Sequence, residues 1–325
     1  MFKSIIITMG DPAGIGPEVT VKALLSPRIR PGVRFVLVGD SFVWGKIPGY
    51  RRLVASGRAE IVDLANVCRK GFCWGRVRRE YGQAAREYLD VALDLLKRRN
   101  LSGLVTAPLN KEAVALSCRG FSGQTEYLAH KTSCADFAMF LANARLKIAL
   151  VTRHIPLQRV AARINTVDIC RVVKLTEAFL RRFYRIRRPR IALSGLNPHS
   201  SDNGLIGREE AEKIAPAIAI LKKTIRCCGP YPVDTLFKLA LRRPASLFHA
   251  AVVMYHDQAL IPLKISGEDS GVNITLGLPF VRVSPLHGVA FDIAGRNRAA
   301  ASSMIAAINT AARSNHYRLI EAKPR

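Results

Sequence analysis

Three histidines occupy equivalent positions in the sequence, each within a few residues of the end of a short apolar run. They are His154, His199 and His256. In α/β sheets, ligands bind outside the carboxyl ends of the strands, so side chains delivered there can converge. Imidazole nitrogens bind zinc and other first-row divalent metals, and three protein ligands leave a position open for a substrate. The positions predict a metal site, although three isolated loop or core histidines would give the same pattern.

The residue after the last of these histidines is acidic. Asp257 follows His256 directly, where a carboxylate could orient the imidazole or act as a fourth ligand. His130, His249 and His316 follow no comparable run, and we interpret them as structural residues.

A glycine-rich segment, 10–18, follows the first apolar run of the chain. A strand, a glycine-rich turn and a helix N-terminus together form an anion-binding geometry. Pro17 and Glu18 suit the first turn of that helix. The segment is neither a dinucleotide-binding GxGxxG motif nor a P-loop, so a tight strand-to-helix turn explains it equally well.

A second glycine-containing segment, 284–295, lies near the end of the chain. Its glycines allow the backbone to approach a ligand closely, and Asp292 could accept a hydrogen bond from a ribose hydroxyl or an adenine amine. A helix that ends at Gly295 is an equally good interpretation of this segment alone.

Several polar residues stand in otherwise apolar or turn-rich surroundings. They are Lys111, Thr125, Lys264, Asn273 and Arg282. Cations together with an amide and a hydroxyl are the groups that bind a phosphate and a carboxylate. Each of these residues taken alone is better explained as a solvated surface residue.

The elements that would position these residues follow from the alternation of short apolar runs with amphipathic stretches, which is typical of an α/β fold. We expect strands at 4–8, 33–38, 102–106, 136–142, 146–151, 190–194, 249–254 and 272–276. We expect helices at 17–25, 80–99, 167–183, 208–223, 234–242 and 299–313. The stretch 88–96 has apolar residues at steps of three and four, so that face should lie on the core.

The composition favours a folded protein with a strong positive charge. Of the 325 residues, 49% are hydrophobic, and the formal net charge is +26. No apolar run reaches the roughly 18–20 residues of a membrane span. The charge favours anionic ligands and could hold nucleic acid non-specifically, but the arginines are dispersed among no zinc finger, zipper or aromatic RNA-binding motif. We therefore interpret them as solvated faces and expect no specific nucleic-acid partner and no membrane partner.

The cysteines indicate a reducing compartment. The seven are scattered, form no CxxC pair and are odd in number, which does not suit a disulfide framework. The first residues, 1–10, are interpreted as a buried strand that runs straight into Asp11 and Pro12, without a signal-peptide cleavage site. We expect a cytoplasmic protein.

Five segments of the chain resemble the 4-hydroxythreonine-4-phosphate dehydrogenases, a family of pyridoxal phosphate synthesis. They are 10–18, 106–111, 195–199, 255–258 and 271–280. The resemblance covers nearly the whole chain in the family's order. In addition, 287–295 resembles the cofactor loop of isocitrate and isopropylmalate dehydrogenases, whose fold this family shares.

The resemblance implies a two-lobed α/β/α fold without a Rossmann fingerprint. The first lobe would comprise 1–125 and 285–325 with the cofactor loop, and the second 126–284 with the metal ligands and the dimer interface. It implies a homodimer whose active site, in the cleft, draws metal ligands from both subunits. The implied reaction is the oxidation and decarboxylation of 4-phosphooxy-L-threonine to 3-amino-2-oxopropyl phosphate. It would use NAD or NADP and one divalent ion, zinc, cobalt or magnesium.

The resemblance also implies roles for individual residues. The metal ligands would be His154, His199 and His256. Substrate would be bound by the residues at positions matching the family motif, namely Gln124, Thr125, Lys264, Asn273 and Arg282. The adenosine of NAD would lie along 287–295, at His287, Gly288, Asp292 and Gly295. The general base would be Lys111 or Asp234.

Two positions depart from the family pattern. Gln124 stands where the family has a histidine, and Leu286 replaces an acidic residue. Gln124 can form hydrogen bonds but cannot carry a positive charge, and loss of a charge-assisted contact weakens binding by about 1.5–3 kcal/mol. A phosphorylated four-carbon sugar acid or an aromatic dihydrodiol is therefore an alternative substrate. A basic nucleic-acid-binding protein on an enzyme fold is the more remote alternative.

Overall fold

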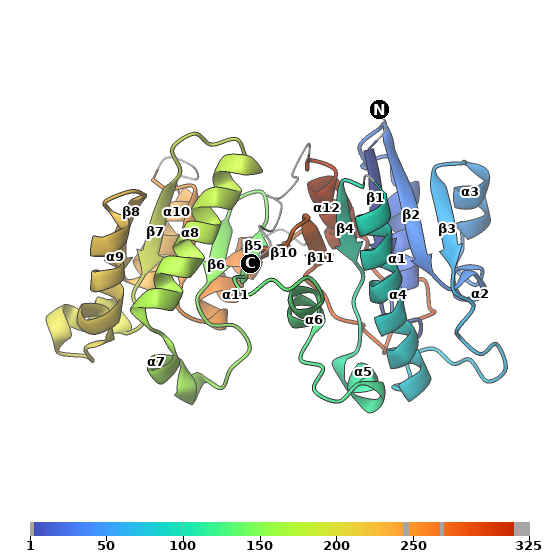
Figure 1. The fold of residues 1–325 in the computed structure, drawn as a ribbon, viewed down its shortest axis with the longest axis horizontal. Helices are drawn as coiled ribbons and strands as arrows, with labels where there is room; N and C mark the ends of the chain where they lie inside the picture. Colours follow the sequence, from blue (N-terminus) through green and yellow to red (C-terminus); the bar gives the residue numbers. More distant parts are fainter. Residues whose placement is uncertain (1–2, 100, 243–246, 267–269, 315–325) are drawn as a thin grey trace. The chain divides into compact units, whose positions relative to one another are not determined.

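The computed structural model describes residues 3–99, 101–242, 247–266 and 270–314. It divides into two compact units, each built on its own part of the chain (Figure 1). The first unit comprises Met1–Cys134 and Leu278–Arg325, and the second comprises Ala135–Gly277. The chain thus leaves the first unit once and returns to it for its last strand and helix.

The first unit contains a parallel sheet with the strand order β3-β2-β1-β4-β11. The strands are β1 (Lys3–Thr8), β2 (Val33–Gly39), β3 (Ala59–Asp63), β4 (Gly103–Thr106) and β11 (Arg282–Pro285). The central strands are buried and consist almost wholly of apolar residues, as expected of strands that helices cover on both faces.

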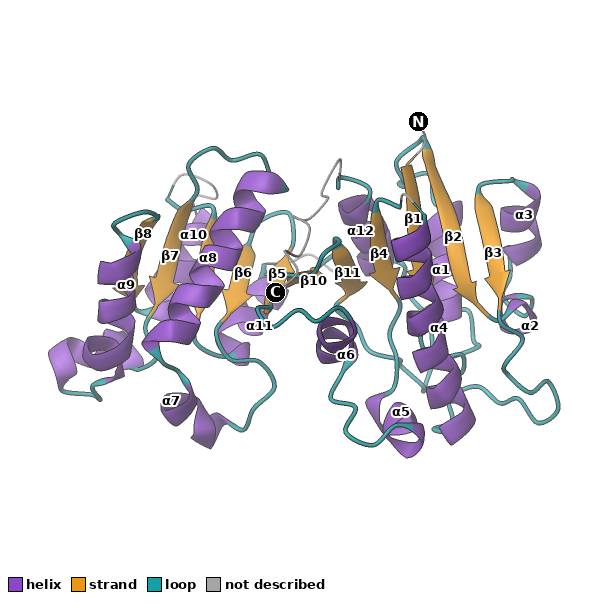
Figure 2. Ribbon diagram, viewed as in Figure 1, coloured by secondary structure: helices purple, strands orange, loops and turns teal. Residues whose placement is uncertain are grey.

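Helices cover both faces of this sheet (Figure 2). The helices of the unit are α1 (Gly16–Leu25), α2 (Ser41–Trp44), α3 (Tyr50–Ala55), α4 (Arg79–Arg98), α5 (Lys111–Ser117), α6 (Gln124–Lys131) and α12 (Ser302–Ala311). The apolar side of α4 packs on β1 and β2, with Tyr81, Tyr88 and Leu89 buried. On the other face, α12 packs on β4, β11 and α1. The strands β2 and β4 lie on opposite sides of β1. Because crossover connections are right-handed, the helices of connections that run in opposite directions along the sheet lie on opposite faces of it.

The second unit contains a mixed sheet with the strand order β10-β5-β6-β9-β7-β8. Its strands are β5 (Ala138–Ala142), β6 (Lys147–Leu150), β7 (Arg190–Ser194), β8 (Arg226–Tyr231), β9 (Ala250–Val253) and β10 (Val272–Leu276). Strand β5 is antiparallel to β10 and β6, whereas β6, β9, β7 and β8 are parallel neighbours. Parallel neighbours bring their carboxyl ends to one edge, and that edge carries the predicted histidines.

The helices of the second unit pack around these strands. They are η1 (Leu157–Arg159), α7 (Val160–Arg163), α8 (Thr166–Arg182), η2 (Pro198–Gly204), η3 (Glu210–Ile214), α9 (Ala215–Leu221), α10 (Val233–Arg242) and α11 (His256–Ile265). The side chain of Asn165 caps α8 by accepting a hydrogen bond from the backbone N–H of Asp168. Helix α8 packs on β5, β6, β9 and β10, and α11 packs on β5, β6 and β9. No helix in the described part of the chain is long and apolar enough to cross a membrane.

All eight predicted strands are present, whereas three strands and several helices were not predicted. The missed strands are β3, β8 and β11, and the missed helices include α5, α6 and α11. The predicted helix 208–223 is a π-helical turn, η3, followed by the short α9. The helical interpretation of 284–295 is wrong, because that segment is β11 followed by turns.

Candidate active site

The three predicted metal ligands lie at the carboxyl edge of the second unit's sheet. His154 follows β6, His199 follows β7, and His256 is the first residue of α11, three residues after the end of β9. These strands are neighbours in the order β6-β9-β7 and run parallel. The prediction that all three histidines lie at the carboxyl edge of the sheet is therefore confirmed.

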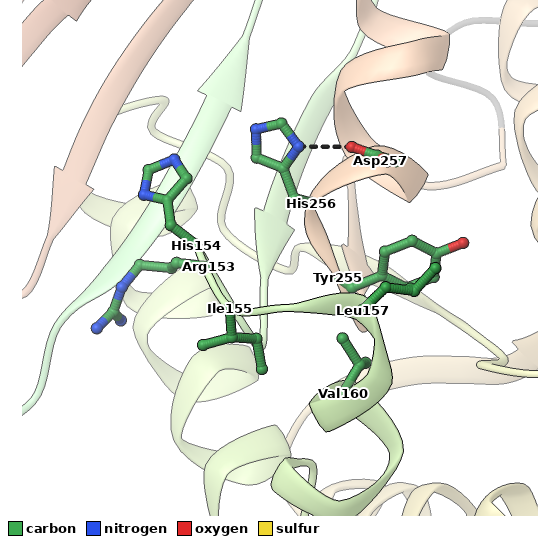
Figure 3. Close-up of a pocket in the computed structure, with 8 residues that line it drawn as sticks. All are labelled: Arg153, His154, Ile155, Leu157, Val160, Tyr255, His256 and Asp257. Carbon is green, nitrogen blue, oxygen red and sulfur yellow. Dashed lines mark hydrogen bonds and ion pairs between the residues drawn. The ribbon is translucent and has the colours of Figure 1, made fainter.

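Two of the histidines face each other. The ring centres of His154 and His256 are 5.5 Å apart, and a cavity of about 260 Å³ opens between them and the segment 155–160 (Figure 3). Nδ1 of His256 lies 2.7 Å from Oδ1 of Asp257, so this carboxylate orients the imidazole. Both rings are accessible at the surface of the unit, where a ligand can reach them.

The pair has the spacing that a shared metal ion requires. An ion about 2.1 Å from one nitrogen of each ring, in tetrahedral geometry, would hold the ring centres about 5 Å apart. The observed separation of 5.5 Å agrees with this arrangement. Because Nδ1 of His256 faces Asp257, Nε2 is the nitrogen left for coordination. The pair fits two ligand positions of a divalent ion.

His199 lies apart from this pair. Within the described residues of this single chain, no three His, Cys, Asp or Glu side chains converge closely enough to hold a metal ion. His199 is exposed and begins a run of five residues, 199–203, that all have a positive φ. Such a conformation is costly for residues other than glycine, and strained segments of this kind concentrate at functional sites.

Buried polar side chains tie the three histidine-bearing segments together. Oγ1 of Thr152 donates to the carbonyl of Met254 at 2.7 Å, which links the end of β6 to the end of β9. Oε1 of Gln258 accepts from the backbone N–H of Met254 at 2.9 Å, and its Nε2 donates to the carbonyl of Gly195 at 2.9 Å. Gln258 therefore joins the segment of His256 to the segment of His199. Its amide also accepts from the hydroxyl of Ser194 at 3.2 Å.

A buried carboxylate holds the turn that leads to His199. Glu210 is 4% exposed, and its Oε1 accepts from the backbone N–H groups of Leu196 and Asn197, both at 2.7 Å. Its Oε2 accepts from the side-chain amide of Asn197 at 2.8 Å. A side chain at Gly195 would collide with this carboxylate, because a Cβ there would lie 2.9 Å from Oε1 of Glu210. Sequence reasoning did not select Glu210, Thr152 or Gln258 as functional residues.

In the first unit, Arg282 is the centre of a second group of predicted site residues. It is 2% exposed, and its guanidinium donates to Oγ1 of Thr106 at 2.7 and 3.1 Å and to Oγ1 of Thr125 at 3.3 Å. Nη2 also donates to Oε1 of Gln124 at 3.1 Å. Burial lowers the pKa of Arg282 to about 10, and the charge of Glu126 partly opposes this shift. The guanidinium is still cationic at neutral pH.

Lys111 lies beside the same group. A Cβ at Gly123 would lie 3.4 Å from Nζ of Lys111 and 3.0 Å from Oε2 of Glu126, so the glycine allows both side chains to approach the start of α6. The side-chain Nε2 of Gln124 donates to the carbonyl of Ala107 at 3.1 Å. Cations, hydroxyls and an amide are thus brought together, as binding of a phosphate or carboxylate requires.

The two glycine-containing segments of the first unit contact each other. The backbone N–H of Ile15 donates to the carbonyl of Val289 at 2.9 Å, and a Cβ at Gly14 would lie 3.1 Å from that same carbonyl oxygen. At the far end of the loop, Gly295 lies against the ring of Trp74, where a Cβ would come within 2.5 Å. The glycine-rich turn and the predicted cofactor loop therefore form one continuous backbone surface, with Trp74 as a partner that sequence reasoning missed.

The predicted cofactor residues differ in exposure. Asp292, Gly288 and Gly295 are exposed, whereas His287 is half-buried, and burial lowers its pKa. Nε2 of His287 is buried without a hydrogen-bond partner. Nδ1 of the same ring lies 3.1 Å from the carbonyl oxygen of Gly288, so Nε2 of the neutral imidazole is an unused acceptor.

The turn before α1 contains a buried acid. Gly10 has a φ of +72°, and a Cβ there would lie 2.2 Å from the carbonyl oxygen of Pro108, so glycine is required. Burial raises the pKa of Asp11 to about 6, and hydrogen bonds from the backbone N–H groups of Ala13 and Asn110 oppose the rise. Asp11 thus links the turn before α1 to the segment that follows β4.

The remaining predicted residues belong to the second unit. Lys264 is exposed near the end of α11, about 12 Å along the helix from His256 at about 1.5 Å per residue. Asn273 is on β10, and its Oδ1 is buried without a hydrogen-bond partner. Asp234 is exposed in the first turn of α10, which packs against η2, the segment of His199.

The chain is similar to known proteins over nearly its whole length. A family model described as pyridoxal phosphate biosynthetic protein PdxA matches residues 43–311. A 4-hydroxythreonine-4-phosphate dehydrogenase of Desulforapulum autotrophicum is 40% identical, with 94% of each chain covered. A D-threonate 4-phosphate dehydrogenase of Salmonella typhimurium is 37% identical, with 95% of this chain and 98% of the relative covered.

Solved structures give the same result for the fold. The crystal structure of 4-hydroxythreonine-4-phosphate dehydrogenase from Klebsiella pneumoniae is 36% identical and has a TM-score of 0.83, with 96% of this chain and 99% of that chain covered. A beta-decarboxylating dehydrogenase from Thermococcus kodakarensis has a TM-score of 0.52 at 13% identity, with 98% and 83% covered, and shares the fold alone. The expected two-lobed dehydrogenase fold is confirmed.

Proposed function

Because this chain belongs to the PdxA family of pyridoxal phosphate biosynthetic proteins, we propose that it oxidises and decarboxylates 4-phosphooxy-L-threonine. The product is 3-amino-2-oxopropyl phosphate, and the electrons pass to NAD. The observation that carries this proposal is the buried Arg282, a permanent cation that already donates to Thr106, Thr125 and Gln124. Such a group is suited to hold the phosphate or carboxylate of a small substrate.

Different residues of the chain have different roles in the proposed reaction. Arg282 and Thr125 bind the anionic group of the substrate, with Gln124 beside them and Lys264 and Asn273 as further substrate contacts. A divalent ion held by His154, His199 and His256 would supply Lewis-acid chemistry, and NAD held along His287, Gly288, Asp292 and Gly295 would supply the hydride acceptor. The pair His154 and His256 supports this ligand set by its spacing. The metal is zinc, cobalt or magnesium, since imidazole alone does not select among them.

Proton removal from the substrate hydroxyl is assigned to Lys111 or Asp234. Lys111 lies next to Gly123 at the start of α6, beside the residues that surround Arg282. Asp234 begins α10, which packs against the segment of His199. A base must come within hydrogen-bond reach of the proton it removes, and each candidate adjoins one group of predicted site residues.

We further propose that the enzyme is a cytoplasmic homodimer with metal ligands from both subunits. The separation of His199 from the pair supports a site that a second subunit completes. The position of Lys264, about 12 Å along α11 from His256, supports its serving the site of the other subunit. Scattered cysteines in odd number support a reducing compartment.

A second candidate substrate is D-threonate 4-phosphate. The Salmonella typhimurium relative named for that substrate is as similar to this chain as several of the 4-hydroxythreonine-4-phosphate dehydrogenases. The two substrates differ at C2, where one has an amino group and the other a hydroxyl. Gln124, a neutral amide in place of the family's histidine, changes the charge next to Arg282.

The test is a comparison of kcat/KM for these two compounds, a phosphorylated erythronate and an aromatic dihydrodiol, with NAD and with NADP. We expect phosphooxythreonine to have the highest kcat/KM and to give NADH, carbon dioxide and the amino ketone. A higher kcat/KM for any other compound would overturn the named substrate. Equal rates in the presence of a chelator would overturn the metal dependence.

A further inference from the structure

The amino edge of the second unit's sheet carries a row of basic side chains. Strands β6, β7 and β8 begin with Lys147, Arg190 and Arg226, and His249 directly precedes β9. The order β6-β9-β7-β8 places these four residues on neighbouring strands. At a strand spacing of about 4.8 Å, the row is about 14 Å long. It lies at the opposite ends of the strands from the histidine site.

The residues of the row are close enough to influence one another. Arg190 and Arg226 are register partners on β7 and β8. The backbone N–H of Arg190 donates to Nδ1 of His249 at 2.8 Å. Burial lowers the pKa of His249, and the charges of Arg190, Lys147 and Arg226 lower it further. Like charges on facing positions of neighbouring strands are destabilising, so the fold maintains this positive field at some expense of stability.

Two segments beside the row add further cations. The segment 181–190 contains six arginines, the segment 222–226 contains two lysines and an arginine, and neither contains an acidic residue. Glu177, earlier on α8, pairs with Arg181 at 3.6 Å. Every exposed side chain of the two segments is cationic except Thr224. A cavity of about 550 Å³ lies at their junction, lined in part by Arg190, Lys222, Lys223 and Arg226.

We propose that this amino edge binds the phosphodiester backbone of a nucleic acid without reading its sequence. Duplex DNA carries one negative charge per about 1.7 Å of its axis, so a row of about 14 Å faces several phosphates at once. One small anion in the cavity would leave the arginines of 181–188 without a ligand. The arginine fork suits phosphate oxygens, and a membrane surface would call for exposed apolar side chains, which these two segments do not offer.

This activity goes beyond the proposed dehydrogenase function and is separable from it. The row and the histidines occupy opposite ends of β6, β9 and β7, so a bound nucleic acid leaves the histidine edge of this unit uncovered. The edge also accounts for part of the net charge of +26, which the chemistry of a small substrate does not require.

The test measures binding of the full chain to a fluorescent DNA duplex of about 20 base pairs by anisotropy, over a series of salt concentrations. The edge variant combines Arg187→Gln, Arg188→Gln and Lys223→Gln. Each lost phosphate contact lowers the slope of log K against log salt by about 0.9. We expect the edge variant to bind roughly 10–100-fold more weakly near physiological salt and to have a slope smaller by about 2 to 3.

The matched control removes the same charge from exposed positions of the first unit, by Arg51→Gln, Arg52→Gln and Lys97→Gln. It should bind like the unmodified chain, and both variants should keep their rate of NADH formation and have a melting temperature no lower than that of the unmodified chain. Equal loss of binding in both variants would overturn the proposal, because binding would then follow net charge alone. So would a lack of binding near physiological salt, or binding only to vesicles of phosphatidylcholine and phosphatidylserine.

Discussion

The Arg282 group and the histidine pair differ in how completely one chain builds them. Arg282 is buried, and the side chains of Thr106, Thr125 and Gln124 already accept from its guanidinium. The rings of His154 and His256 are open to solvent, and their positions depend on the buried contacts beneath them. The proposed anion site is therefore pre-organised, whereas the proposed metal site would need both an underlying frame and further ligands to reach its final geometry.

The largest expected effect comes from removing a metal ligand. We expect His199→Ala and His256→Ala each to abolish metal-dependent NADH formation, because three imidazoles leave little affinity when one is lost. Both residues lie at the surface, so the melting temperature should stay near that of the unmodified chain. His130→Ala, at an exposed histidine of the first unit, is the control and should retain full activity. Full turnover by the His199 variant would remove that residue from the ligand set.

A smaller loss should follow a change in the pre-organised site. Arg282→Lys keeps a cation but cannot donate to Thr106, Thr125 and Gln124 at once. A lost hydrogen bond to a charged group costs about 1.5–3 kcal/mol, so KM for the phosphorylated substrate should rise about 10–100-fold with a smaller change in kcat. The exposed Arg296 provides the control as Arg296→Lys. An unchanged KM would place the anionic group of the substrate elsewhere.

The smallest effect on turnover should come from the frame beneath the histidines, because all three imidazoles remain in place. Gln258→Leu removes the contacts to Met254 and Gly195, and loss of a group that supports metal ligands lowers metal affinity about 10–100-fold. Titration with zinc or cobalt by calorimetry measures this without relying on activity. Gln258→Glu keeps the acceptor for Met254 and should recover part of the affinity. Metal affinity unchanged in the Leu variant, with only its melting temperature lowered, would show Gln258 to be purely structural.

The strands were largely predictable because most of them are short, nearly continuous apolar runs. Strand β8 was not, since Arg226–Tyr231 contains charge, two cysteines and a Gly-Pro pair. Strand β8 is the last in the strand order, and an edge strand can contain a proline because one side of it forms no ladder hydrogen bonds. Helix α11 was missed for a similar reason, as Pro262 interrupts its pattern.

The residue types of the candidate site and the sheet edge that carries the histidines were predictable. The burial of its side chains was not. Strand ends located His154, His199 and His256 on one edge, since parallel neighbours share their carboxyl ends. The burial of Arg282 and the role of Glu210 depend on side chains distant in sequence, which no local pattern encodes. The positive φ of His199 was equally hidden, because it is a property of the folded turn.

The left-handed run at 199–203 has a consequence for how the site responds to its ligands. A non-glycine residue in this conformation costs about 1–2 kcal/mol, and five consecutive residues share it. Contacts such as those of Glu210 with Leu196 and Asn197 hold the run away from the conformations its residues prefer. An occupant that contacts the run in this conformation therefore adds to the free energy that holds it there. The order of residues 199–203 and the affinity of His199 for an occupant should then rise together.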